Sequence, residues 1–194
     1  MSTEAELVED LKKVGIYISS VWDLLKRSDN YNEALTILID YLKKAEDVRL
    51  KEGIVRAMGV KGFNAAVPLL IAEYKISDHD GYKWAIANTL EIIAPKESID
   101  ELNEIMADRK HGDARQMIAL ALGRIKDESS VNILIESLND SDVYLHSIAA
   151  LGKIGDKTAI EPLKPFLYHK VRGVRKEAEK ALKRIRKKNN LVSV

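Results

Sequence analysis

The sequence contains few side chains of the kind that perform covalent or metal chemistry. There is no cysteine among its 194 residues, which excludes thiolate nucleophiles, disulfides and thiolate metal ligands. Its four histidines are followed by Asp80, Gly112, Ser147 and Lys170, so none begins a His-Glu ligand pair. No nucleophile motif is present either. We therefore expect no catalytic residue, no cofactor and no bound metal.

Two of these histidines, His79 and His111, have acidic neighbours that could assist metal binding. They lie one period of a sequence repeat apart, and Asp78, Asp80 and Asp113 are close to them in the sequence. Neighbouring helical repeats would hold the two rings about 10 Å apart, whereas a metal ligand lies about 2 Å from its ion. One ion cannot bridge them. The favoured interpretation is that both histidines cap helices or face solvent.

A short basic segment, Arg109-Lys110-His111-Gly112, leads into a predicted helix. The N-terminus of a helix can bind an anion through its free backbone N–H groups. The segment lacks the glycine-rich cradle of a phosphate-binding loop, however. A plain turn, with Asp113 capping the next helix, is the simpler interpretation, and the role of the loop stays open.

Charge is unevenly distributed along the chain. The whole sequence has a formal net charge of +1, but the segment from Lys170 to Lys188 carries +8 and the remainder −7. This segment could bind phosphates, which makes nucleic acid a possible partner. It contains no aromatic residue for base stacking, and cations also suit the C-terminus of a helix at the polar end of a repeat array. A capping role is therefore favoured, and nucleic acid is a less favoured partner.

Helical repeats must position these residues. Five similar triplets recur 29 to 32 residues apart: Ala57-Met58-Gly59, Thr89-Leu90-Glu91, Ala121-Leu122-Gly123, Ala150-Leu151-Gly152 and Ala181-Leu182-Lys183. Each ends a pattern of side chains at i, i+4, i+7 and i+8, as in Ala114, Ile118, Ala121 and Leu122. These spacings place the residues on one face of a helix. Each triplet therefore marks the first helix of a repeat.

A second helix is predicted after each of the first four triplets, with apolar residues at i, i+3 and i+7. These are Val67, Leu70, Tyr74; Ile99, Leu102, Met106; Val131, Leu134, Leu138; and Ile160, Leu163, Leu167. Neither helix of a repeat can bury its apolar side alone, so the repeats must stack.

Two more elements precede the regular repeats. Leu35, Leu38 and Leu42 give the second-helix pattern of a degenerate repeat, whose leading helix is predicted at 21–26. Ser20 and Asp23 have the spacing of a capping box at its start. A further helix from Glu4 to Val14, stopped by Gly15, is predicted to cap the N-terminal end.

The first-helix pattern resembles the HEAT-like repeat noted in phycobilin lyases, which reads V-R-x-x-A-x-x-A-L-G. The matching stretches begin at Ala114-Arg115, Val143-Tyr144 and Val174-Arg175. Tyr144 replaces the usual basic residue, and Glu91 replaces the usual glycine, so packing is expected to differ there. The resemblance covers about residues 32–188. The chain is also similar to small bacterial proteins that contain this repeat.

The resemblance implies an all-α fold, an armadillo-like α-α superhelix (solenoid) of about five HEAT-like helical hairpins. We expect a single domain over 1–194, with the N-terminal capping helix in 1–15 and the degenerate repeat in 20–44. Four repeats are expected in 47–168 and a basic capping helix in 171–188. The resemblance also implies that first helices form the convex side and second helices line the concave side.

On the second helices, the positions two residues before and after each core leucine point away from the core. They are Thr36, Asp40, Pro68, Ala72, Asp100, Glu104, Asn132, Glu136, Glu161 and Pro165. Five are carboxylates and none is basic. The carboxylates could attract a basic protein surface, or they could be an ordinary solvated face. The candidate partner-binding residues are Asp40, Asp100, Glu104, Asn132, Glu136 and Glu161.

The favoured hypothesis is a non-enzymatic protein-binding scaffold or adaptor that uses this face. Two alternatives stay open: a bilin-lyase-like enzyme or accessory factor, suggested by the resemblance alone, and nucleic-acid binding through the basic C-terminal helix. No apolar run approaches the roughly 20 residues of a membrane span. The first ten residues are acidic where a secretory signal would be basic. We therefore expect a cytoplasmic protein without membrane contact.

Overall fold

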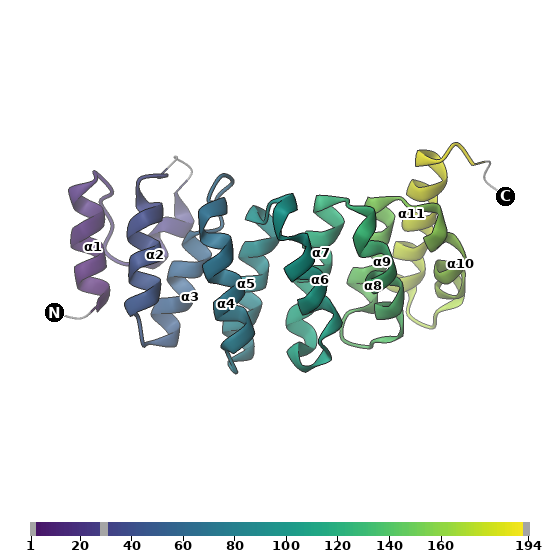
Figure 1. Ribbon diagram of the computed structural model, residues 1–194, viewed down its shortest axis with the longest axis horizontal. Helices are drawn as coiled ribbons and strands as arrows, with labels where there is room; N and C mark the ends of the chain where they lie inside the picture. Colours follow the sequence, from purple (N-terminus) through teal and green to yellow (C-terminus); the bar gives the residue numbers. More distant parts are fainter. Residues whose placement is uncertain (1–2, 28–30, 192–194) are drawn as a thin grey trace. The chain divides into compact units, whose positions relative to one another are not determined.

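The computed structural model describes residues 3–27 and 31–191, and these ranges contain helices and turns but no strand (Figure 1). Residues 1–2 of the predicted capping segment and 28–30 of the predicted degenerate repeat lie outside them. The helices fall into two compact units, Met1–Ala94 (unit 1) and Pro95–Val194 (unit 2). The all-α repeat architecture is confirmed, whereas a single domain over the whole chain stays a prediction.

In its described residues, unit 1 has six principal helices. They are α1 (Thr3–Lys13), the 3₁₀ helix η1 (Val21–Lys26), α2 (Ala34–Lys44), α3 (Val48–Ala57), α4 (Val67–Ile76) and α5 (Asp80–Ile93), with a 3₁₀ turn η2 (Asn64–Ala66) before α4. The first helices form one layer, in which α3 packs between η1 and α5. The second helices form the other layer, where α2 contacts α1 and α3, and α4 contacts α5.

Local sequence signals determine where the first elements of unit 1 begin and end. Gly15 has a φ of 82°, the left-handed conformation that ends a helix at little cost, and it lies two residues after the end of α1. Ser20 and Asp23 form the predicted capping box of η1, although the element is 3₁₀ rather than α. The Ser20 hydroxyl also donates to Glu4 over 2.7 Å, which joins η1 to α1.

Unit 2 repeats the same two-layer arrangement (Figure 1). Its helices are α6 (Ile99–Ala107), α7 (Arg115–Ile125), α8 (Val131–Glu136), α9 (Tyr144–Ile154), α10 (Ile160–Leu163) and α11 (Arg172–Lys188). Its 3₁₀ segments are η3 (Lys96–Ser98), η4 (Arg109–Ala114), η5 (Glu128–Ser130), η6 (Ser137–Asn139), η7 (Lys157–Ala159) and η8 (Lys164–Tyr168). The first helices α7, α9 and α11 pack in sequence, and α6, α8 and α10 cover them one by one.

The glycine of the repeat triplet allows the first helices of unit 2 to approach closely. A Cβ atom added to Gly123 would lie 2.7 Å from the Cα of Ala150, and one added to Gly152 would lie 2.6 Å from the Cα of Ala181. Because backbone stands in the way, no side-chain rotation can relieve either clash. The third residue of the triplet is therefore glycine wherever two such helices touch backbone to backbone.

Replacing Gly152 with alanine should lower the free energy of unfolding by about 1–3 kcal/mol, because α9 and α11 must move apart to admit the methyl group. The matched control is Gly173→Ala on α11, where the added Cβ would have no neighbour within 4 Å. That change should be neutral or stabilising by less than about 1 kcal/mol, because alanine favours helix. Urea denaturation followed by circular dichroism measures both. Equal effects would contradict the close approach.

Candidate protein-interaction face

Burial on the second helices follows the predicted register. The five core leucines, Leu38, Leu70, Leu102, Leu134 and Leu163, are each 0% exposed. The six candidate partner-binding residues, Asp40, Asp100, Glu104, Asn132, Glu136 and Glu161, are all exposed. Their exposure makes them available to a partner, while their role in binding one stays a prediction.

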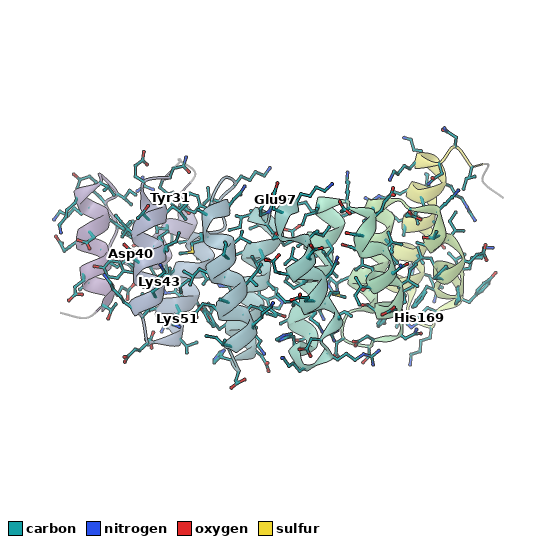
Figure 2. All side chains as sticks on the ribbon, in the orientation of Figure 1. Tyr31, Asp40, Lys43, Lys51, Glu97 and His169 are labelled. Atoms are coloured by element: carbon teal, nitrogen blue, oxygen red, sulfur yellow. The ribbon has the colours of Figure 1, made fainter. Side chains whose placement is uncertain are left out.

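Five of the six residues belong to unit 2, and we refer to Asp100, Glu104, Asn132, Glu136 and Glu161 as the acidic face. Asp100 and Glu104 lie on α6, Asn132 and Glu136 on α8, and Glu161 on α10. Helices α6 and α8 contact each other, so their four residues share one surface. Asp40 lies on α2 in unit 1 (Figure 2) and is therefore considered separately.

One carboxylate of the acidic face is partly neutralised. Lys164, one turn further along the chain, places its Nζ 2.6 Å from Glu161 Oε1. Both side chains are largely exposed, so this pair contributes little to stability. Within the described ranges, neither Asp100 nor Glu136 forms an ion pair. In these ranges, the charges of Asp100 on α6 and Glu136 on α8 are therefore not neutralised by an ion pair.

A small pocket adjoins this face beside Glu136. It has a volume of about 70 Å³ and is lined by Met106, Ala107, Arg109, Arg115, Ile133, Glu136, Ser137 and Asp140. Sites for small organic molecules usually measure about 300–1,000 Å³. The lining also holds Asp140, which pairs with both Arg115 and Arg109. The pocket is therefore better explained by a local ion-pair network than by a ligand.

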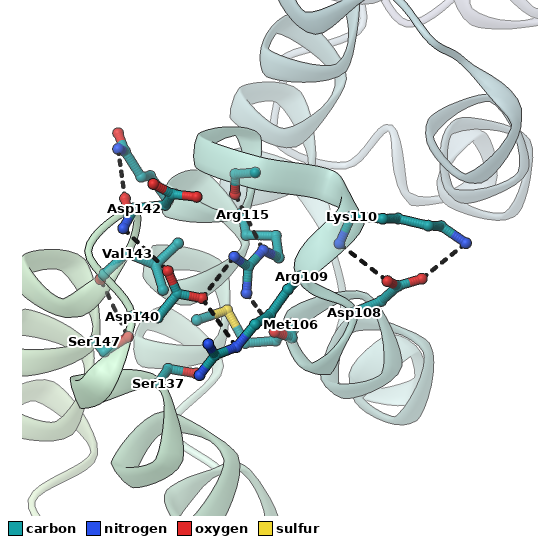
Figure 3. Close-up of polar contacts among 12 residues, drawn as sticks. Met106, Asp108, Arg109, Lys110, Arg115, Ser137, Asp140, Asp142, Val143 and Ser147 are labelled. Atoms are coloured by element: carbon teal, nitrogen blue, oxygen red, sulfur yellow. Dashed lines mark hydrogen bonds and ion pairs between the residues drawn. The ribbon is translucent and has the colours of Figure 1, made fainter.

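Arg115 is the centre of that network (Figure 3). Its side chain is only 2% exposed. The guanidinium donates from Nη2 to Asp140 over 2.8 Å, from Nη1 to the Met106 carbonyl over 3.1 Å, and from Nε to the Gly112 carbonyl over 3.1 Å. One side chain thus joins the end of α6, the η4 segment and the turn that precedes α9.

Asp140 is the carboxylate that balances this buried charge. Burial acts to raise the pKa of Asp140, but the hydrogen bond from Arg115 and that from the Asp142 backbone N–H act against it. The positive charges of Arg115 and Arg109 add to this effect, and the net result is a pKa below the ordinary value for aspartate. Asp140 is therefore ionised near neutral pH, as the ion pair requires.

The Arg109-Lys110-His111-Gly112 loop differs from its prediction in two ways. Asp113 does not cap the next helix, because the N-cap of α7 is Ala114 and has no side-chain hydrogen bond, whereas Asp108 caps η4 by accepting from the Lys110 backbone N–H over 3.1 Å. His111 is only 4% exposed, so the interpretation that it faces solvent was wrong. The loop forms 3₁₀ turns that are interrupted at Gly112, where a φ of 54° and a ψ of −141° are not helical, and it buries His111, which the prediction of a solvated turn overlooks.

His79 behaves as predicted for a capping residue. It precedes α5, and its Nδ1 accepts a hydrogen bond from the backbone N–H of Tyr82 over 3.2 Å. In the part of the chain that the structure describes, no group of three or more histidine, aspartate or glutamate side chains could hold a metal ion. No helix there has the length and apolar character to cross a membrane.

Comparison with known proteins agrees with this arrangement. The profile of HEAT repeats matches residues 35–123 and 108–183, which together make up more than half of the chain. The chain belongs to the HEAT repeat family. Among solved structures, an engineered protein matches with a TM-score of 0.58 and 20% identity, over 96% of this chain and 98% of its own. That likeness supports the helical repeat fold.

Protein YibA of Escherichia coli, from strain K12 and from O157:H7, is a further relative. Each copy is 30% identical over 113 residues, which are 58% of this chain and 40% of YibA. The chain thus matches less than half the length of these curated relatives. A structure of human deoxyhypusine hydroxylase in complex with glycerol has a TM-score of 0.34 and 14% identity, over 95% of this chain and 97% of its own.

In the HEAT repeats of unit 2, the residue after the first apolar position of the first helix contacts other segments through its side chain. The sequence identified this position but not its contacts. Arg115 occupies it in α7, and Arg175 in α11 donates to the carbonyls of His169 and Lys170 over 2.7 and 3.1 Å. Tyr144, the predicted exception, instead places its ring 6.0 Å from Phe166 and 5.7 Å from His169. The repeat motif marks this position, but the partners come from other segments.

Proposed function

We propose that this chain is a non-enzymatic protein-binding scaffold, and that the acidic face of unit 2 receives a positively charged segment of the partner. HEAT repeats generally serve as protein-interaction scaffolds, because stacked helices present long continuous surfaces. The observation that carries the finer proposal is the register of α6 and α8. Their leucines are buried, while Asp100, Glu104 and Glu136 are exposed together on the opposite side.

Charge supports a basic partner over an acidic or neutral one. Like charges on adjacent helices repel each other, and a surface shaped for stability alone would be expected to alternate lysine with glutamate. Elsewhere in this unit such pairs occur, as between Lys96 and Asp127 at 2.8 Å. A cationic partner would relieve the repulsion on the acidic face, and complementary charge mainly increases the rate and specificity of association.

A charge-reversal experiment tests the proposal. The partner is first isolated by pull-down with the tagged protein, and a short lysine-rich peptide serves as a second, defined probe. Glu104→Lys with Glu136→Lys should slow association about ten- to a hundredfold at low salt, with a smaller difference as salt rises. The double variant should keep its fold, since exposed substitutions usually change stability by about 0.5 kcal/mol each.

The matched control carries the same change in charge outside the acidic face. Glu97 and Glu128 are exposed residues in η3 and η5, and Glu97→Lys with Glu128→Lys alters the net charge equally. Association kinetics of both double variants are compared at two salt concentrations. If the control slows association as much as the test variant, or if neither has an effect, the acidic face is an ordinary solvated surface.

A further inference from the structure

A second surface feature of unit 2 is a basic pocket that the protein-binding proposal does not use. It has a volume of about 300 Å³ and is lined by Lys126, Gly152, Lys153, Gly155, Arg184 and Lys188. We call it the basic pocket. Four of its six residues are cations and none is acidic. They come from the C-terminal ends of α7, α9 and α11, so three successive repeats contribute to it.

The cations of the basic pocket follow the repeat, but only in this part of the chain. Lys153 and Arg184 each stand two residues after the leucine of their triplet. In unit 1 the same position is held by Val60 and Ile92, which are apolar. A cation there is therefore not required by the HEAT repeat itself. The cations at this position on the neighbouring helices α9 and α11 are therefore specific to this surface of unit 2.

Lys126 occupies a backbone conformation that favours another residue. It caps α7 with a φ of 61° and a ψ of 37°, in the left-handed region. One repeat later the same capping position is held by Gly155, with a φ of 77°. Glycine adopts this conformation without steric cost, whereas lysine does not. The chain thus keeps a cation at the pocket although glycine would suit the backbone better.

The C-terminal end of a helix carries partial negative charge, which would repel an anion. In the basic pocket, side-chain donors already compensate that negative charge. Lys188 donates from Nζ to the Ile154 carbonyl over 2.8 Å, and Asn189 donates to the Gly155 carbonyl over 2.9 Å. In the described ranges, the side chains of Lys126, Lys153 and Arg184 have no carboxylate partner. These three positive charges are available to a ligand.

We infer that the basic pocket binds a compact anion that carries two or more linked phosphate groups. Arginine and lysine are the residues that bind phosphate oxygens, and the pocket volume is at the lower end for small-molecule sites. Three available cations match the several charges of linked phosphates better than one phosphate ion. Nucleic acid is less well suited, because the lining has no aromatic ring on which a base could stack.

The affinities of different phosphate compounds distinguish which kind of anion the basic pocket binds. Calorimetric titrations at low salt use inorganic phosphate, tripolyphosphate, adenosine triphosphate and a single-stranded oligonucleotide. Tripolyphosphate should bind more tightly than phosphate. Tighter binding of the nucleotide than of tripolyphosphate would assign a nucleotide ligand, and equal or weaker binding would assign a free polyphosphate. If phosphate binds as well as tripolyphosphate, or the oligonucleotide binds most tightly, the inference is overturned.

Substitutions then locate the site. Lys126→Gly should weaken tripolyphosphate binding about five- to tenfold, the effect expected for losing one nearby charge. It should leave the thermal midpoint unchanged or higher, because glycine favours the capping conformation. Lys153→Ala with Arg184→Ala should weaken binding further. The control, Lys176→Ala with Lys183→Ala, removes two exposed cations of α11 that do not line the pocket. Equal weakening by the control pair would indicate diffuse attraction and refute a site.

Discussion

Replacing Arg115 with alanine is expected to lower the free energy of unfolding by about 3–5 kcal/mol, because it leaves the buried Asp140 carboxylate without its closest cationic partner. The Asp140 side chain is only 8% exposed, and its 2.8 Å hydrogen bond to Arg115 would be lost. The carbonyls of Met106 and Gly112 would also lose the donor that they share. Equilibrium urea denaturation near neutral pH measures the loss.

Arg109 provides the matched control for this prediction. Its Nε lies 3.6 Å from the same oxygen of Asp140, but its side chain is 69% exposed. Water screens such a pair, so Arg109→Ala should cost less than about 1 kcal/mol. Similar small losses in both variants would show that the buried guanidinium is replaceable by solvent, and would contradict the assigned role of Arg115.

The free energy of unfolding should depend on pH differently in the wild type and in Arg115→Ala. In the wild type, folding lowers the pKa of Asp140. Its charge therefore stabilises the folded state at pH values above the unfolded pKa of 3.8, and this stabilisation is lost as pH falls through the folded pKa. In Arg115→Ala, burial without the arginine should raise the pKa of Asp140 instead. The difference in stability between the two proteins should therefore narrow as pH is lowered from about 7 to about 3.

The second large effect is expected for Leu134→Ala, which should lower the free energy of unfolding by about 2–5 kcal/mol. Leu134 is 0% exposed on α8, and α8 contacts both α6 and α9. Removing the Leu134 side chain would leave a cavity between these helices. The cavity could be filled only if the two helix layers moved. Asn132→Ala, an exposed change on the same helix, should stay within about 0.5 kcal/mol. A loss below about 1 kcal/mol for Leu134→Ala would contradict a shared core.

Periodicity was sufficient to predict which face of each helix is buried, but not how far each helix extends. The first-helix pattern of Ile118, Ala121 and Leu122 corresponds to side chains that are all 0% exposed. The last second helix was expected to continue to Leu167, yet α10 ends at Leu163 and continues as the 3₁₀ helix η8. Pro165 accounts for this, because it has no backbone N–H to donate to the carbonyl of Glu161, while Lys164 keeps right-handed helical angles, with a φ of −55° and a ψ of −42°.

The partners of individual side chains could not be obtained from the pattern in the same way. Exposure of the acidic face follows from helix geometry alone, and it was predicted. Arg115 and Asp140 are 25 residues apart, and their ion pair depends on how one repeat packs on the next. The basic pocket likewise draws Lys126, Lys153 and Arg184 from three helices. A single sequence indicates the face of the helix on which a residue lies, but not the side chains that the residue contacts.

The varied partners at the Arg115 position also fix the order of the repeats. Counted from the triplets, Val171 stands one repeat after Asp140, so Tyr144 faces no carboxylate where Arg115 has one. Exchanging α7 with α9 would place an arginine beside Val171, which offers no carboxylate, and would set Tyr144 against Asp140, away from Phe166. Solenoid repeats are often treated as interchangeable modules. In this unit the side-chain partners make each first helix specific to its own place in the array.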